Sequence, residues 1–190
     1  MKLLKDRILK DGKILPGNVL KVDSFLNHQI DVNLLAACAD EWYERFKDCG
    51  INKIMTVEAS GIGIACITAQ RFNVPVLFAK KSKSSNIGND FYSTKVVSFT
   101  HGRSYDVIAS KSYINANDRF LLIDDFLANG SALRAMTELV KLGGATVVGA
   151  GIAIEKAYQN GGEELRKSGL RIESLAKIAS MSEDGNIEFV

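Results

Sequence analysis

One short run of residues constrains this chain of 190 residues more than any other part of its sequence. It begins with four apolar residues, 120–123, which predict a buried strand of a parallel sheet. Two carboxylates, Asp124 and Asp125, follow immediately and are expected to end that strand. A turn of small residues at 128–130 then leads into a helix predicted over 131–142, where apolar residues recur at helical spacing.

This order of elements places two kinds of ligand-binding group side by side. The N–H groups at the start of a helix bind phosphate well, because they have no partner inside the helix and the helix dipole favours an anion. Carboxylates at the end of the preceding strand can accept hydrogen bonds from neighbouring sugar hydroxyls. A bare turn of this kind also occurs as an ordinary strand-to-helix connection with an acidic cap. The complete run favours a site for a sugar 5-phosphate.

The run resembles the 5-phosphoribosyl 1-diphosphate (PRPP) motif of the type I phosphoribosyltransferases, which has four apolar residues, two acids, a short spacer, Thr-Gly and a small residue. Asn129 stands where that motif usually has Thr, a variant that is similar to the branch of the family acting on xanthine. The resemblance implies that Asp124 and Asp125 are catalytic and bind the ribose hydroxyls. It also implies that the PRPP phosphate is bound by Ala128, Asn129, Gly130, Ser131 and Ala132.

Predicted strands and helices alternate along most of the chain. The strands are predicted at 53–58, 75–79, 119–124, 146–154 and 171–177, and the helices at 2–11, 31–48, 62–72, 131–142 and 160–168. This alternation predicts an α/β fold with a doubly wound, mostly parallel sheet that binds ligands at the carboxyl ends of its strands. Two segments depart from it. They are a small cap at 13–30 and a flexible antiparallel flap at 80–110, with a polar loop at 80–90 and extended runs at 91–99 and 105–110.

The composition fits one globular domain over residues 1–190, with 46% hydrophobic and 24% charged residues. A net charge of +2 is too small to indicate binding to nucleic acid or to a membrane. The first residues become charged too early for a signal peptide, and no apolar stretch is long enough to span a bilayer, so a cytoplasmic protein is expected. Cys38, Cys49 and Cys66 are scattered without metal-ligand spacing. Cys38 and Cys66 fall in apolar helical patterns and are expected to be buried free thiols.

Two further segments follow predicted strands and resemble the diphosphate-binding parts of the family. The first is the run 58–63, in which Ser60 and Gly61 are expected to bring backbone N–H groups close to PRPP. The second is Lys80 and Lys81, of which Lys81 is the better candidate to neutralise the diphosphate leaving group. A tight glycine turn and a solvated basic loop are the ordinary alternatives for these two segments.

The resemblance implies that the purine base is bound by Leu20, Asn27 and Lys156. Leu20 would pack on the ring, and Asn27 would hydrogen-bond the 2-oxo group through an amide that can both donate and accept. Lys156 belongs to a charged pair with Glu155 after a very apolar strand, a place where a charged pair is not expected to serve packing. A surface pair at a helix entry is the alternative for these two residues. The two histidines, His28 and His101, have no evident carboxylate partner and are expected to be structural or exposed.

The implied reaction transfers the 5-phosphoribosyl group of PRPP to N9 of xanthine, with Mg²⁺ held mainly through PRPP and few protein ligands. Related enzymes for hypoxanthine and guanine carry an Asp where Ala128 stands, so no general base is assigned here. A homodimer is expected because the family commonly forms one. Two alternatives stay open at this point: a PRPP-sensing regulatory protein of the same fold, or a transferase for guanine, hypoxanthine, adenine or orotate.

Overall fold

A six-stranded sheet forms the centre of the protein in a computed structural model, which describes residues 1–81, 90–97, 104–182 and 184–190. The strand order is β10-β9-β8-β7-β3-β4. The strands are β3 (Lys53–Val57), β4 (Val76–Ala79), β7 (Arg119–Leu127), β8 (Thr146–Lys156), β9 (Ile172–Met181) and β10 (Ile187–Phe189). Only β10 runs antiparallel to its neighbour among these strands. The predicted mostly parallel sheet is therefore confirmed.

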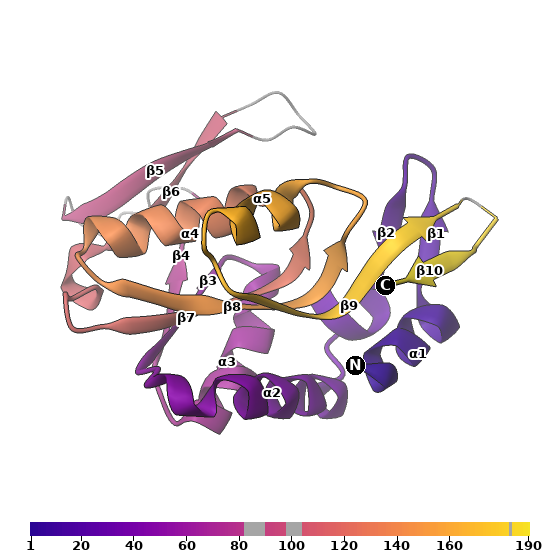
Figure 1. Cartoon of the computed structure of the whole chain (residues 1–190), viewed down its shortest axis with the longest axis horizontal. Helices are drawn as coiled ribbons and strands as arrows, with labels where there is room; N and C mark the ends of the chain where they lie inside the picture. The colour runs from indigo at the N-terminus through magenta and orange to yellow at the C-terminus, as the bar shows by residue number, and fades with distance from the viewer. Residues whose placement is uncertain (82–89, 98–103, 183) are drawn as a thin grey trace.

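Helices cover both faces of this sheet, as a doubly wound fold requires (Figure 1). On one face lie α2 (Val32–Phe46) and α3 (Ser60–Phe72), and on the other lie α4 (Ser131–Leu142) and α5 (Gly161–Lys167). Alternate residues of β7 supply the two cores: Leu121 and Ile123 pack with α2 and α3, whereas Phe120 and Leu122 pack with α4. The apolar run in the sequence is unbroken because this central strand is buried on both of its faces.

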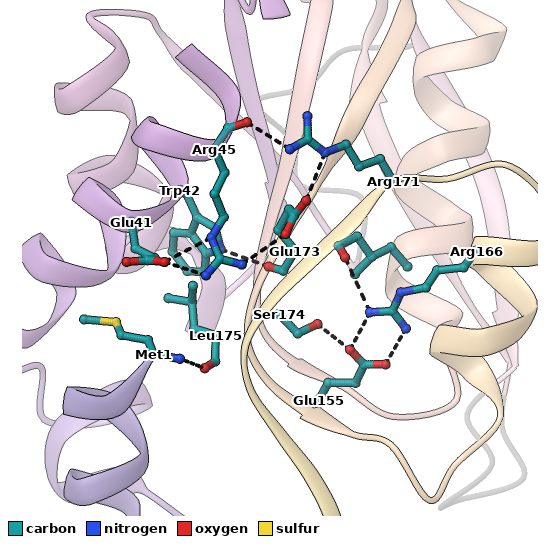
Figure 2. Close-up of polar contacts among 11 residues, drawn as sticks. Met1, Glu41, Trp42, Arg45, Glu155, Arg166, Arg171, Glu173, Ser174 and Leu175 are labelled. Atoms are coloured by element: carbon teal, nitrogen blue, oxygen red, sulfur yellow. Dashed lines mark hydrogen bonds and ion pairs between the residues drawn. The ribbon is translucent and has the colours of Figure 1, made fainter. Parts of the chain in front are cut away.

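The cap is attached to one end of the sheet. Helix α1 (Lys2–Asp11) is followed by a hairpin of β1 (Lys13–Leu15) and β2 (Val19–Lys21), and then by the π-helical turn η1 (Asp23–Asn27). The Met1 amino group donates a hydrogen bond to the carbonyl oxygen of Leu175 in β9, which joins α1 to the sheet (Figure 2). The predicted cap outside the core sheet is confirmed, whereas the helical turn η1 was not predicted.

A second small sheet stands over α4 and corresponds to the predicted flap (Figure 1). Its two strands, β5 (Phe91–Val97) and β6 (Ser104–Ser110), pair antiparallel as expected. Val96 and Val107 pack into the same core cluster as the buried residues of α4, so the flap contributes side chains to the hydrophobic core. Residues 82–89 of the predicted polar loop and residues 98–103, including His101, lie outside the described residues. Short 3₁₀ helices occur at η2 (Lys47–Cys49) and η4 (Lys111–Tyr113).

The expected end of the central strand at two carboxylates is wrong. Strand β7 continues through both acids to Leu127, because its pairing with β8 extends as far as Leu127 and Glu155. Its pairing with β3 on the other side stops at Met55 and Leu122. The two acids therefore lie on a part of β7 that is paired with β8 and no longer with β3.

Several other boundaries and burial states differ from expectation. Strand β9 extends four residues beyond its predicted end at 177, and α3 begins at Ser60, two residues earlier than predicted. Strand β8 includes Lys156 instead of ending two residues earlier, and the antiparallel edge strand β10 was not predicted. Cys66 is exposed, because it lies on α3 between Ala65 and Ile67 and away from the face that buries Ile64 and Thr68. Cys38 is buried as expected, and burial raises the pKa of its thiol to about 12.

No helix in the described ranges is long and apolar enough to cross a membrane.

Candidate active site

The paired acids at the sheet edge are held in fixed orientations by the strand itself. Asp124 and Asp125 are each 7% exposed. The backbone N–H of Asp125 donates to Oδ1 of Asp124 at 3.0 Å, and the N–H of Phe126 donates to Oδ1 of Asp125 at 3.0 Å. One oxygen of each carboxylate is thus fixed by the backbone, which orients the other oxygen for a further partner.

Burial raises the pKa of Asp124 well above its ordinary value, and the neighbouring charge of Asp125 adds to this effect. The positive charge of Lys81 acts in the opposite direction and lowers the pKa of Asp124. Burial raises the pKa of Tyr105, and the charge of Asp124 raises it further. These couplings place Lys81 and Tyr105 in the electrostatic field of the acids. A carboxyl group with a perturbed pKa, beside a second acid at the carboxyl end of a sheet, is typical of a binding or catalytic site.

The turn after β7 has the backbone geometry of an anion site. Gly130 has a left-handed conformation with φ of 81°, which a residue with a side chain rarely adopts. Oδ1 of Asn129 accepts hydrogen bonds from the Ser131 backbone N–H at 3.0 Å and from its hydroxyl at 2.8 Å. Asn129 thereby fixes the start of α4, whose first-turn N–H groups have no carbonyl partner within the helix. This segment and the acids come from one continuous strand–turn–helix unit.

The segment after β3 lies directly beside Asp124. Oε1 of Glu58 accepts a hydrogen bond from the Lys81 backbone N–H at 2.7 Å, which joins the two predicted diphosphate segments. Ser60 is exposed at the start of α3, and Gly61 is buried. A Cβ atom at Gly61 would lie 3.3 Å from Oδ1 of Asp124 and only 2.0 Å from Oγ1 of Thr56. The glycine is therefore needed for the close approach of this turn to the acids.

Thr56 is a neighbour of the site that sequence reasoning missed. Its side chain is fully buried in β3, and its hydroxyl has no hydrogen-bond partner among the residues that the structure describes. A single threonine in a predicted strand does not indicate a binding site. Its place beside the site depends on the start of α3, where Gly61 packs against it.

The predicted base-binding residues lie on the cap and on the end of β8. Nδ2 of Asn27, the last residue of η1, donates to Oδ2 of Asp125 at 2.9 Å. Nζ of Lys156 donates to the carbonyl oxygen of Asn18 in the cap hairpin at 2.9 Å, and burial lowers the pKa of Lys156. Leu20 is 6% exposed on β2 and packs within the core of the cap. The fold thus brings Asn27 to the acids and Lys156 to the cap, while Leu20 shows little free surface.

Glu155 is buried, whereas its neighbour Lys156 is only partly buried. The expectation that this charged pair does not serve packing is therefore wrong for Glu155. Its carboxylate is buried and accepts two hydrogen bonds from the Arg166 guanidinium, at 2.6 and 2.7 Å, and one from the Ser174 hydroxyl (Figure 2). Burial alone would raise the pKa of Glu155, but the hydrogen bonds and charge of Arg166, together with Ser174, outweigh it and lower the pKa. Glu155 is an internal ion-pair partner. His28 is exposed, as expected.

A cavity of about 820 Å³ opens beside the turn that follows β7. Its lining includes Asn129 and Ser131 of the turn, Thr94 of β5, Tyr158 between β8 and α5, and Gly161, the first residue of α5. This volume lies in the range of small-molecule sites in proteins. Asp124 and Asp125 do not line it, so the cavity adjoins the turn at Asn129 and Ser131 and not the acids.

Comparison with known proteins agrees with this geometry. Residues 21–179 match the family described as phosphoribosyl transferase domain. This range includes both acids and the turn that follows them. The chain belongs to the phosphoribosyltransferase family, and a member of this family is a pentosyltransferase enzyme.

Relatives of similar length narrow the comparison. A xanthine phosphoribosyltransferase from Lachnoclostridium phytofermentans is 56% identical over 190 residues, with 100% of this chain and 98% of the relative covered. One from Finegoldia magna is 54% identical, with 98% of each chain covered. Among solved structures, adenine phosphoribosyltransferase from Rhodothermus marinus shares the fold with a TM-score of 0.75, at 18% identity, with 93% of this chain and 99% of that chain covered.

Proposed function

We propose that this protein transfers the 5-phosphoribosyl group of PRPP to N9 of xanthine, giving xanthosine 5′-phosphate and diphosphate. Full-length relatives that are 52–56% identical and carry the name xanthine phosphoribosyltransferase support this acceptor. The observation that carries the proposal is the juxtaposition of the two fixed carboxylates, Asp124 and Asp125, with the helix start at Ser131. A pentose ring with a 5-phosphate matches both halves of this unit.

In the proposed reaction the anomeric carbon becomes positively charged and oxocarbenium-like as diphosphate departs. Asp124 and Asp125 accept hydrogen bonds from the ribose hydroxyls and place negative charge beside the developing cation. Binding of the sugar next to Asp124 also favours its ionised form, because each hydroxyl donates to the carboxylate. The 5-phosphate is bound by the turn and helix start, namely Ala128, Asn129, Gly130, Ser131 and Ala132.

The diphosphate lies between the two remaining segments in this proposal. Backbone N–H groups at Ser60 and Gly61 approach its oxygens, and Lys81 balances the charge that develops when the bond breaks. Mg²⁺ supplies further neutralisation of the diphosphate when bound. Asp124 and Asp125 offer carboxylate oxygens, the donor type this ion prefers, and no cluster of three acidic, histidine or cysteine side chains occurs in the described ranges. Mg²⁺ would therefore be held mainly through PRPP itself.

Xanthine recognition is assigned to Leu20, Asn27 and Lys156. An amide carries two N–H donors and one acceptor, so Asn27 can keep its bond to Asp125 and still bond the 2-oxo group. The half-buried Lys156 supplies a positive charge next to a base that readily loses a proton. Ala128 cannot transfer a proton, so catalysis rests on positioning and on charge stabilisation. The proposal includes closure of the flap over PRPP, a homodimer and a cytoplasmic location.

The acceptor is tested by measuring kcat/KM for xanthine, guanine and hypoxanthine with PRPP and Mg²⁺. The value for xanthine is expected to be the highest of the three. Equal values would replace the xanthine assignment by general purine transfer. Failure to release diphosphate with any purine or pyrimidine base, in protein that is folded, would contradict the enzymatic proposal itself.

A further inference from the structure

The first turn of α5 packs against the turn that is assigned to the 5-phosphate. A Cβ atom at Gly161 would lie 2.3 Å from the carbonyl carbon of Asn129 and 2.4 Å from the carbonyl oxygen of Ala128. Both of these are backbone atoms, which cannot move aside as a flexible side chain does. A Cβ at Gly130 would in turn lie 2.8 Å from Cδ1 of Leu165 in α5. The turn and α5 therefore fit together with no room for an additional methyl group on either side.

Helix α5 needs an anchor to serve as a support. It has seven residues, and a helix this short is not stable by its own hydrogen bonds. Arg166 near its end forms the two-pronged ion pair with Glu155 on β8, and Ser174 on β9 donates to the same carboxylate (Figure 2). Glu155 is 3% exposed, whereas the Arg166 side chain is 29% exposed, so the pair is buried on its carboxylate side and partly open to solvent on its guanidinium side. The two parallel hydrogen bonds fix its geometry.

These contacts form one continuous chain from the centre of the sheet to the phosphate turn. Glu155 near the carboxyl end of β8 binds Arg166 and also accepts a hydrogen bond from Ser174 near the start of β9. Arg166 holds α5, and Gly161 at the start of α5 packs against the backbone at 128–129. We propose that Gly161 and the Arg166–Glu155 pair are positioning residues, which set the backbone N–H groups of residues 128–132 for the sugar 5-phosphate. This inference rests on the proposed function, since it concerns the same phosphate site.

The proposal predicts different effects at the two ends of PRPP. Helix α5 contacts the turn proposed for the 5-phosphate, whereas the diphosphate is assigned to Ser60 and Gly61. The variants Gly161→Ala and Arg166→Met are tested in the full-length protein for binding of ribose 5-phosphate and, separately, of Mg²⁺-diphosphate, by calorimetry. Lys167→Met is the control, since it removes an ion pair with Glu163 on the same helix that is mostly exposed to solvent. Because removing one partner of a buried ion pair can unfold a protein, the double variant Glu155→Gln/Arg166→Met is included.

A hydrogen bond to a charged group contributes roughly tenfold to a hundredfold in affinity, so weakening one such bond to the phosphate should cost at least about fivefold. Ribose 5-phosphate should bind that much more weakly to Gly161→Ala and to the double variant, with Mg²⁺-diphosphate affinity within about twofold of the starting protein. Lys167→Met should bind both as before. Unchanged ribose 5-phosphate affinity in folded Gly161→Ala and double variants would overturn the inference, as would equal weakening of both ligands. If the unaltered protein binds no ribose 5-phosphate, the proposed function fails instead.

Discussion

The hydrogen bond from Asn27 to Asp125 links a residue proposed to bind the base to one proposed to bind the ribose. Nδ2 of Asn27 is 2.9 Å from Oδ2 of Asp125, while Oδ1 of the same carboxylate is held by the strand backbone. Both oxygens are thus fixed before any substrate arrives. The substitution Asn27→Ala leaves one oxygen without its partner and frees the carboxylate to rotate, so it should weaken PRPP binding even when no purine is present.

The size of this effect follows from the freedom that Asp125 regains. Immobilising a side chain on binding costs about 0.5–1.5 kcal/mol, which corresponds to a rise of roughly two- to tenfold in the PRPP dissociation constant. A hydrogen bond to a charged carboxylate contributes about 1.5–3 kcal/mol, and the lower value is appropriate because Asn27 is only half-buried. The free energy of unfolding of Asn27→Ala should therefore decrease by about 1.5 kcal/mol. Asn27→Asp should weaken PRPP binding further, since it places a second negative charge beside Asp125.

The assay is calorimetric titration of Mg²⁺-PRPP into purine-free protein, followed by steady-state kinetics with xanthine. Lys156→Met is the matched control, because Lys156 is assigned to the base end and donates to the Asn18 carbonyl rather than to a carboxylate. It should raise KM for xanthine and leave purine-free PRPP binding unchanged. If folded Asn27→Ala binds PRPP as tightly as the unaltered protein, the reasoning about Asp125 is refuted, whatever happens to xanthine.

Three further predictions concern the acids and the turn beside them. Asp124→Asn and Asp125→Asn should each lower turnover in folded protein, and wild-type turnover in both would remove the ribose assignment. Because the pKa of Asp124 is raised in the folded state, its stabilising contribution is present below the ordinary value of 3.8 and is lost as pH rises through the raised value. Asp124→Asn should therefore make the substrate-free protein more resistant to urea at neutral pH, and the difference should vanish in acid; a gain independent of pH would contradict this. Gly61→Ala should cost about 1–3 kcal/mol of stability by crowding the Thr56 hydroxyl, which lies 2.0 Å from the added Cβ. The double variant Thr56→Ala/Gly61→Ala should recover most of that loss in thermal unfolding, and no recovery would mean that the strain lies elsewhere.

Much of the fold could be predicted from sequence because local patterns and burial agree along the chain. Strand β7 is apolar without alternation, and its two sets of residues do fill separate cores on opposite faces. Helix α4 begins and ends at the predicted residues, since its apolar spacing is regular and its start follows a glycine turn. The acids and the turn could be identified together for the same reason, as they form one continuous segment.

What the sequence determined by itself was local: which segments are strands or helices, and which polar groups share a strand–turn–helix unit. Only the tertiary structure decided how far β7 extends, because its end depends on β8 remaining paired after β3 has separated. It also decided that Glu155 is an internal partner of Arg166 and that Asn27 reaches Asp125. Such contacts join residues distant in the chain, and the spacing of side chains along a sequence carries no record of which strands and helices will become neighbours.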